Sequence, residues 1–317
     1  MALFLREADV EKLLPIPDAI SAVENAFALL GAGEASDHPR GRAEAQGAVL
    51  NAMWAVAPTI DAMGVKAYPI VRSDVTQSSA STFVLYGLPE GKLEAILESE
   101  TLGQRRTGAA SAVATRYLAR PESRVLTVFG AGWQAEGQVA ALARVLPNLD
   151  LVLVVGRSKE RRDRFVARMR ANLGIAVQVA EPEEAVRSAD VLVTITGAAS
   201  PLFDGAWLRP GTHINAAGSN FVGKRELDAT TVRRADLVVA DSAGVARLES
   251  GDLISNDFDW GRLHEIGEVV GGAAPGRRTE EEITLFESHG LAMEDLVCAA
   301  EVLKRARETG FGTELPV

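Results

Sequence analysis

Three basic residues in the first third of the chain lie where a cation is costly unless it is paired or has a function. Arg42 lies in a polar run before a strand, Lys66 lies inside the apolar stretch MGVKAYPIV, and Arg106 lies in LGQRRTGAAS, where a helix of small residues starts. Burial of a lysine is unfavourable unless its charge is compensated or used. Three cations that meet in one cavity would suit a carboxylate, which arginine can bind with two hydrogen bonds. The alternative is that Lys66 is an ordinary surface lysine at the edge of a strand.

A glycine motif in TVFGAGWQAEG indicates a second kind of chemistry. Gly130-x-Gly132-x-x-Ala135 comes directly after an apolar strand and directly before a helix, and this context distinguishes a dinucleotide-binding fingerprint from an ordinary turn. Gly130 allows the tight turn, Gly132 lets the backbone approach a pyrophosphate at the helix N-terminus, and Ala135 allows close helix–strand packing. The motif predicts dinucleotide binding; a glycine turn that binds no nucleotide is the alternative.

The end of the second strand of this region, VVGRS, indicates which dinucleotide is bound. Such folds usually carry an acid there, which binds the adenosine ribose, but here the position is Arg157, followed by Ser158, Lys159, Arg161 and Arg162. An acid would repel a 2′-phosphate, whereas arginine can pair with it. The sequence therefore favours NADP(H) over NAD(H). A solvated basic start of a helix is the alternative.

Two threonines end the fourth strand of this region, DVLVTITG. Ligands of parallel sheets lie at the carboxyl ends of the strands, so Thr194 and Thr196 are expected on the nicotinamide side. Ordinary β-branched strand content explains them equally well.

The elements that must position these residues fall into two domains. From Arg124 onward, apolar strands alternate with helices, which predicts an α/β domain with a doubly wound, Rossmann-type parallel sheet. The first third reads as α+β. The amphipathic helix LAMEDLVCAAEVLKRARE follows the nucleotide domain and is expected to pack on the first domain. The predicted boundaries are residues 1–117 with 290–317 for the first domain and 118–289 for the Rossmann domain.

Composition narrows the class of protein. The 317 residues carry a formal net charge of −10, which disfavours nucleic acid or an anionic membrane as the main partner. One cysteine, Cys298, and four dispersed histidines give neither a disulfide framework nor a zinc spacing, so no metal site is predicted. Early charges in MALFLREADVEKLL and the lack of an 18-residue apolar run predict a soluble cytoplasmic protein.

Five segments occur in order over nearly the whole chain: GVKAYP, GQRRTGAASAVATRYLA, VFGAGWQA, INAAGSNFVGKRELD and EITLFESHGLAMEDL. Together they resemble the ornithine cyclodeaminase/μ-crystallin family. The resemblance implies a first domain that binds substrate and forms a homodimer, completed by the C-terminal helix, and a second, Rossmann domain. It also implies an activity among amino-acid cyclodeamination, alanine or arginine dehydrogenation, and reduction of ketimines or cyclic imino acids.

The resemblance also assigns roles to residues. Arg42 and Arg106 would grip a substrate carboxylate, and Lys66 would lie beside the reacting carbon–nitrogen bond as proton donor or electrostatic partner. Arg42 is matched in preference to Arg40 because of its distance to Lys66 along the chain. The expected cofactor-binding residues are Thr107, Gly130, Ala131, Gly132, Gln134, Ala135, Arg157, Ser158, Arg162, Thr194 and Thr196.

Two departures from the family pattern bear on the reaction. The family's cyclodeaminases and alanine dehydrogenases carry a catalytic aspartate where this chain has Asn220, and an asparagine cannot act as a carboxylate base. The cyclodeaminases also carry an acid after the first arginine, at the position matched here to Met53 in the substrate site. Both departures weaken the cyclodeaminase interpretation.

The favoured hypothesis is an NADPH-dependent reductase of a ketimine or cyclic imino acid, or a related amino-acid dehydrogenase. Its substrate would be a small-molecule imine bound by its carboxylate. Lys66 or an ordered water would supply the proton, and Asn220 would orient that water or the nitrogen. An imine already favours hydride addition, so the lost aspartate is tolerable. Two alternatives remain open: an ornithine or lysine cyclodeaminase or alanine dehydrogenase, and a non-catalytic NADPH-dependent binding protein like some μ-crystallin relatives.

Overall fold

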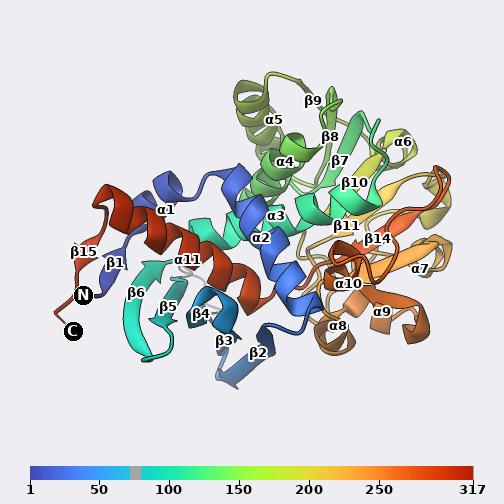
Figure 1. The fold of residues 1–317 in the computed structure, drawn as a ribbon. Coiled ribbons are helices and arrows are strands. Elements are labelled where there is room, and N and C mark those ends of the chain that lie inside the picture. Colours follow the sequence, from blue (N-terminus) through green and yellow to red (C-terminus); the bar gives the residue numbers. More distant parts are fainter. Residues whose placement is uncertain (72–79, 317) are drawn as a thin grey trace. The chain divides into compact units, whose positions relative to one another are not determined.

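The computed structural model describes residues 1–71 and 80–316, and the chain divides into two compact units. Unit 1 is Met1–Arg106 with Leu291–Val317, and unit 2 is Thr107–Gly290. The first division falls inside helix α3 (Glu100–Leu118), between Arg106 and Thr107, whereas the sequence prediction places it after residue 117. Unit 1 is therefore discontinuous in sequence, because the residues of unit 2 are inserted between its two segments (coloured along the chain in Figure 1).

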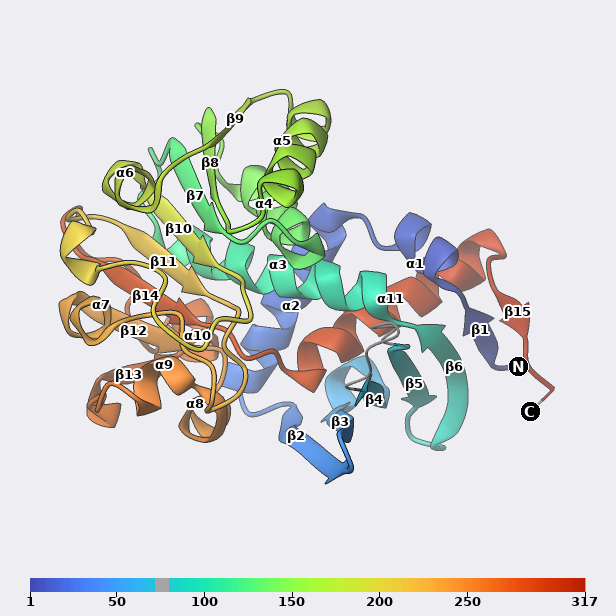
Figure 2. The same ribbon diagram turned by 180° about the vertical axis from the view of Figure 1, so that it is seen from behind.

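Unit 1 is built on a seven-stranded sheet of order β15-β1-β6-β5-β4-β3-β2. Its elements are β1 (Leu3–Leu5), α1 (Glu7–Leu13), α2 (Ile16–Gly31), β2 (Ser36–Ala45), β3 (Ala48–Ala57), β4 (Ala62–Val71), β5 (Thr82–Gly87), β6 (Lys92–Glu98), α11 (Ala292–Thr309) and β15 (Thr313–Glu314). All neighbouring strands are antiparallel except β1 and β6. The pairing of β1 with β15 brings the two chain ends side by side (Figures 1 and 2).

The two faces of this sheet differ because strand residues point alternately to opposite faces. One row across four paired strands is buried and consists of Met53, Lys66, Phe83 and Leu97. Helix α11 covers this inner face, and its first eight residues are all buried. The adjacent row consists of Trp54, Val65, Val84 and Ile96, which are half-buried or exposed although apolar. This outer face has no covering element in the described part of the chain.

Unit 2 is built on an eight-stranded sheet of order β13-β12-β14-β11-β10-β7-β8-β9, in which every pairing is parallel. Its strands are β7 (Val125–Phe129), β8 (Leu151–Val155), β9 (Ala176–Val179), β10 (Val191–Thr194), β11 (His213–Ala216), β12 (Leu237–Ala240), β13 (Leu263–Glu265) and β14 (Thr284–Glu287). Its helices are α4 (Trp133–Val145), α5 (Lys159–Leu173), α6 (Pro182–Ser188), α7 (Ala229–Arg234), α8 (Ala243–Glu249), α9 (Gly251–Ile254) and α10 (Ile266–Val270).

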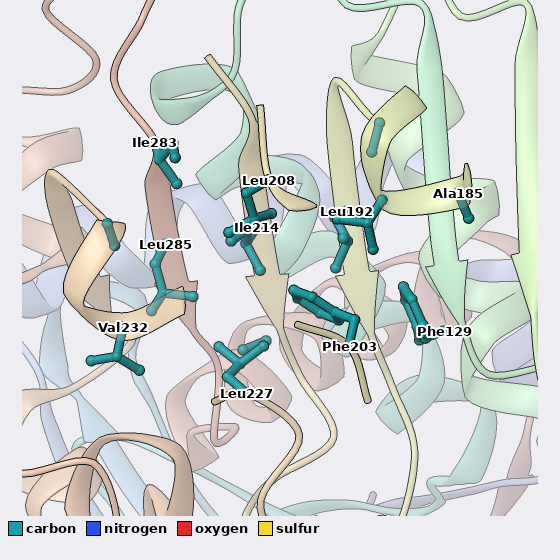
Figure 3. Packing of buried hydrophobic residues seen from close by; sticks show 14 of the residues in the cluster. Phe129, Ala185, Leu192, Phe203, Leu208, Ile214, Leu227, Val232, Ile283 and Leu285 are labelled. Atoms are coloured by element: carbon teal, nitrogen blue, oxygen red, sulfur yellow. The ribbon is translucent and has the colours of Figure 1, made fainter. Parts of the chain in front are cut away.

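Each face of the parallel sheet has its own core. On one face, Val139 of α4 and Phe165 of α5 pack with strand residues such as Val128. On the other, Phe203, Leu208 and Val232 pack with Leu192, Ile214 and Leu285 of the strands (Figure 3). A parallel sheet covered on both faces has continuously apolar strands, which explains why LVLVV and VLVT lack alternation. The predicted Rossmann-type α/β fold is confirmed.

Strand order places a topological switch beside β7. After β7 the chain adds β8 and β9 on one side, and then returns to add β10 on the other side. Ligands of doubly wound sheets bind at such a point, outside the carboxyl ends of the strands. The glycine motif follows β7 directly, so it lies at the expected place.

No single helix of the described residues is long and apolar enough to cross a membrane. Helices α1 and α2 meet the length and composition criteria only as a pair bent by 84°.

Candidate active site

A cluster of two cations and two carboxylates lies between the inner face of the unit 1 sheet and helices α3 and α11. Lys66 Nζ donates to Asp295 Oδ1 at 2.8 Å, and Arg106 Nη1 donates to Glu294 Oε2 at 2.9 Å. Arg106 Nε also lies 3.3 Å from Asp295 Oδ1. Both carboxylate side chains are fully buried. The cluster thus joins strand β4, helix α3 and the C-terminal helix, whose acids are separated from Lys66 by more than 200 residues of sequence.

Burial and neighbouring charges act in opposite directions on the two cations. Burial lowers the pKa of the Lys66 ammonium, Arg106 and Arg40 lower it further, and the pair with Asp295 does not restore it. For Arg106, burial alone would lower the pKa, but the carboxylates of Asp295 and Glu294 raise it above its ordinary value. Arg106 is therefore a permanent cation suited to binding an anion. Lys66 releases its proton more easily than an ordinary lysine, as a proton donor must.

Arg42 and Arg40 differ in burial. Arg42 is exposed on β2, whereas Arg40 is buried and close enough to Lys66 to affect its pKa. The β2–β3 register shifts between His38 and Gly41, and beyond the shift Arg42 pairs with Asn51, which lies on the same face as Met53 and Lys66. Arg40 is the arginine of this segment that lies with the buried cations.

Met53 lies next to the cluster. It is 2% exposed and pairs directly with Lys66 across β3 and β4, so it forms part of the apolar surroundings of the ammonium group. Two positions before it, Asn51 is also buried and donates from Nδ2 to the carbonyl oxygen of Tyr68 at 3.4 Å. Asn51 was not among the residues predicted from the sequence, and it brings a buried polar side chain to the same face.

The glycine loop of unit 2 has the geometry of a pyrophosphate cradle. Gly130 has φ +128°, and a Cβ there would meet the carbonyl oxygen of Ile195 at 2.7 Å. Gly132 is the N-cap of α4, and a Cβ there would point into space that no described residue occupies within 4 Å. Within the described residues, no side chain caps this helix. Free N–H groups at a helix N-terminus favour an anion.

The other predicted residues of the loop surround this helix start. Ala135 is fully buried against the sheet, and Ala131 is half-buried. Gln134 is half-buried, but its Oε1 atom is buried and accepts no hydrogen bond from the described residues. A buried polar atom without a partner needs one from a ligand or water. A pyrophosphate offers only acceptors, so the donor for this oxygen would be a hydroxyl or N–H group of a ligand, or a water.

The basic residues after β8 lie at the same end of the sheet. Arg157 is exposed, and Ser158 is the N-cap of α5, accepting from the amide of Arg161 at 3.3 Å. Arg162 packs its side chain over Gly156, 3.4 Å from where a Cβ would lie, and its Nε atom is buried. Arg162 therefore belongs to the surroundings of the glycine loop, whereas Arg157 is free to reach a ligand from solvent.

The remaining predicted residues differ in accessibility. Thr194 is fully buried at the end of β10, while Thr196, two residues on, is half-buried. Asn220 is half-buried in the loop after β11 and accepts from Lys224 Nζ at 3.3 Å. Thr107 accepts a hydrogen bond from Gln138 of α4 through its carbonyl at 3.2 Å, which ties α3 to the helix of the glycine loop.

Glu294 and Asp295 are the main site residues that sequence reasoning missed. A signal was present, since two adjacent acids interrupt the apolar run LAMEDLVCAA much as Lys66 interrupts its strand. Glu226 was also missed: it is fully buried in unit 2 and accepts hydrogen bonds from Thr196. Within residues 1–71 and 80–316, no group of three or more His, Cys, Asp or Glu side chains could hold a metal ion.

Comparison with known proteins places these residues in a family. The family model described as Ornithine cyclodeaminase/mu-crystallin family matches residues 1–310. The chain belongs to this family. The resemblance inferred from its sequence segments is therefore confirmed.

Several members of the ornithine cyclodeaminase/mu-crystallin family are similar to this chain, and their names describe reactions at carbon–nitrogen bonds. A Delta(1)-pyrroline-2-carboxylate reductase of Bacillus cereus is 35% identical over 272 residues, 83% of each chain. The solved structure of Thermococcus litoralis Delta(1)-pyrroline-2-carboxylate reductase with NADH and L-proline has a TM-score of 0.94 at 34% identity and covers 99% of this chain and all of its own. An archaeal alanine dehydrogenase dimer with bound NAD gives 0.93 at 32% identity, covering 99% and 98%.

Proposed function

We propose that this protein is an NADPH-dependent reductase of small imino acids, with a ketimine or cyclic imine carboxylate as substrate. The observation that carries the proposal is the buried set of Lys66, Arg106 and Arg40 in unit 1. Arg106 and Arg40 are both buried beside Lys66, and an arginine can bind a carboxylate with two hydrogen bonds. The names of the similar family members support the same reaction class.

Each residue of the cluster has a role in this proposal. Arg106 and Arg40 bind the substrate carboxylate, and Glu294 holds the Arg106 guanidinium through Nη1. Reduction adds a hydride to the imine carbon and a proton to the nitrogen. Lys66 supplies that proton and becomes a neutral amine, which its lowered pKa favours. Asp295, 2.8 Å from Lys66 Nζ, keeps the ammonium oriented until the transfer.

The cofactor is held by unit 2. Gly130 provides the tight turn, Gly132 and the first turn of α4 provide backbone N–H groups for the pyrophosphate, Gln134 offers its side-chain amide, and Arg157 with Arg162 meets the adenosine 2′-phosphate. When bound, a reduced nicotinamide supplies a hydride. The similar structures hold NADH or NAD, and NADPH is proposed here because Arg157 replaces the usual acid.

The direction of the reaction follows from position 220. Oxidation of a free amine requires a base that removes a proton, and Asn220 cannot provide one. Imine reduction requires only a donor, which Lys66 can be. We therefore propose that reduction is faster than oxidation at neutral pH. An alanine dehydrogenase or cyclodeaminase activity would need its base from elsewhere in the site.

The assay that tests the function follows NADPH or NADH absorbance at 340 nm with pyrroline-2-carboxylate, piperideine-2-carboxylate, or pyruvate with methylamine. We expect oxidation of the cofactor with at least one imine, and faster turnover with NADPH than with NADH. Release of ammonia from ornithine without net change in cofactor would instead identify a cyclodeaminase. Tight NADPH binding without turnover on any imine would leave only a binding function.

Replacement of Arg157 with alanine tests the choice of cofactor. One lost charge-assisted hydrogen bond of about 1.5–3 kcal/mol raises a Kd roughly 10- to 150-fold. We expect that rise for NADPH and less than a roughly twofold change for NADH, both measured by fluorescence titration. Arg164→Ala is the matched control. Arg164 is also exposed, but it lies in the second turn of α5, whereas Arg157 precedes the helix. Equal effects on both cofactors would show that Arg157 does not contact the 2′-phosphate.

We propose that the protein is a homodimer joined through the outer face of the unit 1 sheet. This face carries Trp54 and Val56 at 38% exposure and Leu50 at 52%, and an apolar patch of this kind usually marks an interface. The similar alanine dehydrogenase is described as a dimer.

Trp54→Lys places a charge on this outer face and is expected to convert the dimer into a monomer, as measured by sedimentation velocity. A charge buried without a partner costs several kcal/mol, or roughly a hundredfold or more in dissociation constant. Val179→Lys, at an exposed apolar position of β9 in unit 2, is the control and should remain dimeric. Retention of the dimer by the Trp54 variant would place the interface elsewhere.

A further inference from the structure

The buried carboxylate of Glu226 connects the carboxyl ends of two neighbouring strands. Its Oε1 atom accepts from the Thr196 amide at 2.7 Å and from Thr196 Oγ1 at 2.6 Å, just after β10. Its Oε2 atom accepts from the Gly218 amide at 3.1 Å, just after β11. Glu226 is 0% exposed. One side chain thus holds both loops that follow these adjacent strands.

The surroundings fix this carboxylate tightly. Asp252 Oδ1 accepts from the amides of Glu226 and Leu227 at 2.6 and 2.7 Å, which holds the backbone on both sides of the side chain. At Gly218, a Cβ would lie 2.4 Å from Glu226 Oε2 and 2.5 Å from both the amide nitrogen and the carbonyl oxygen of Thr196. Only glycine allows this approach, so the loop is shaped around the carboxylate.

The loop held by Glu226 leads directly to a residue of the proposed site. Asn220 lies two residues after Gly218, and Thr196 is a predicted cofactor-binding residue. In a doubly wound sheet the carboxyl ends of the strands face the ligand, and β10 and β11 lie on the nicotinamide side of the switch point.

We propose that Glu226 is a positioning residue for the reductase: as a carboxylate it holds Thr196 and the Gly218–Asn220 loop in the arrangement that turnover requires, and its protonation releases the loop. This inference rests on the proposed function. Two backbone N–H groups and one hydroxyl donate to the Glu226 carboxylate. A proton on either oxygen removes the negative charge, so these charge-assisted hydrogen bonds become ordinary, weaker ones and hold the two loops less firmly.

Glu226 changes its protonation state near neutral pH. Burial raises the pKa of its carboxyl to about 7, with a further increase from Asp252, while the hydrogen bonds from Thr196 lower it. The titratable and charged groups around it are Asp252 of α9, Glu287 of β14, the adjacent Arg225, and, beyond Glu287, His289 and Asp241. Burial, with the charges of Asp252, Glu226 and Asp241, holds the pKa of Glu287 well above its ordinary value.

The expected pH dependence follows from the ionisation of Glu226 and Lys66. Above about pH 7, Glu226 is ionised and the loop is held; below it, Glu226 is protonated and turnover declines. Lys66 acts at the opposite limb, because its proton is lost as pH rises. A bell-shaped profile of kcat results. We assign the acidic limb to Glu226.

The test compares Glu226→Gln with wild type. A displaced loop costs roughly 10- to 100-fold in rate, so we expect kcat at pH 8 to fall by this factor and the inflection near pH 7 to disappear. The KM for imine and the Kd for NADPH should change less than about threefold. Glu226→Asp, which keeps a carboxylate, should restore part of kcat. Glu287→Gln is the matched control, since Glu287 is buried in the same region but bonds to Ser250, and should keep the inflection.

Hydrogen exchange separates this inference from the proposed function. The Thr196 and Gly218 amides donate to Glu226, so peptides containing them should lose protection as pH falls through about 7, after correction for intrinsic rates. In Glu226→Gln that change should be absent. This readout needs no substrate, so it holds even if no imine is reduced. Wild-type kcat in the glutamine variant, or protection that does not respond to pH, would overturn the proposal.

Discussion

Lys66→Met is expected to lower kcat for imine reduction by roughly 100- to 10,000-fold, the usual contribution of a general acid. Methionine retains the length and apolar stem of lysine but has no proton to give. The Kd for NADPH should remain unchanged, because Lys66 lies in unit 1 and the glycine loop lies in unit 2. Stopped-flow measurement of a single turnover separates the chemical step from product release.

Two further variants secure this prediction. Removal of Lys66 takes away the nearer of the two cations beside the buried Asp295 and leaves Arg106 Nε at 3.3 Å. Loss of one partner of a buried ion pair can destabilise a protein by about 3–5 kcal/mol. The double variant Lys66→Met/Asp295→Asn removes the carboxylate charge as well and should fold like wild type while remaining inactive. Lys92→Met changes an exposed lysine of β6 and should leave turnover intact. Turnover near the wild-type rate in the double variant would exclude Lys66 as proton donor.

Arg106→Lys is expected to raise the KM for an imino acid roughly 10- to 150-fold with a smaller change in kcat. Lysine keeps the charge but loses the planar pair of donors that binds a carboxylate, and a hydrogen bond to a charged group contributes about 1.5–3 kcal/mol. The pair with Glu294 remains possible for a lysine, so the fold should survive. Initial-rate kinetics with pyrroline-2-carboxylate measure the effect.

A substrate without a carboxylate tests whether the effect of Arg106→Lys arises from binding of the carboxylate. With 1-pyrroline, which lacks the group that Arg106 binds, wild type and Arg106→Lys should differ little, so the two changes should be strongly non-additive. Arg40→Lys should show the same dependence on the carboxylate, and Arg42→Lys should not, because Arg42 is exposed. Equal losses with both substrates would mean that Arg106 does not bind the carboxylate.

The contrast between Arg40 and Arg42 shows where sequence reasoning stopped. Spacing along the chain to Lys66 selected Arg42, whereas Arg40 is the buried arginine of this segment and the one whose charge lowers the pKa of Lys66. A register irregularity lies between His38 and Gly41, and Pro39 and Gly41 are residue types common at bulges, but which arginine is left buried depends on the pairing with β3. The glycine loop was predictable because strand, turn and helix are contiguous and each residue has a local reason to be there.

The acids of the site were hidden for a related reason. Glu294 and Asp295 meet Arg106 and Lys66 only because α11 returns across the unit 1 sheet, and the periodicity of a helix does not name its partner. Glu226 lies in a loop without regular structure, where its three donors come from two other segments. The sequence predicted the fold class and singled out Lys66 and Arg106 as site residues. The acids that pair with them could be identified only from the contacts in the folded structure.

The discontinuity of unit 1 bears on how the chain folds as it is synthesised. Thr107–Gly290 is contiguous and can complete its parallel sheet once it leaves the ribosome, whereas strands β1–β6 wait for α11 and β15, which are made last. Until then the inner face of the antiparallel sheet has no cover, and Lys66 and Arg106 lack their carboxylates. Exposed apolar strands of this kind favour aggregation and chaperone binding. Nascent chains arrested before residue 291 should therefore be protease-resistant in the Rossmann segment and protease-sensitive in the preceding one.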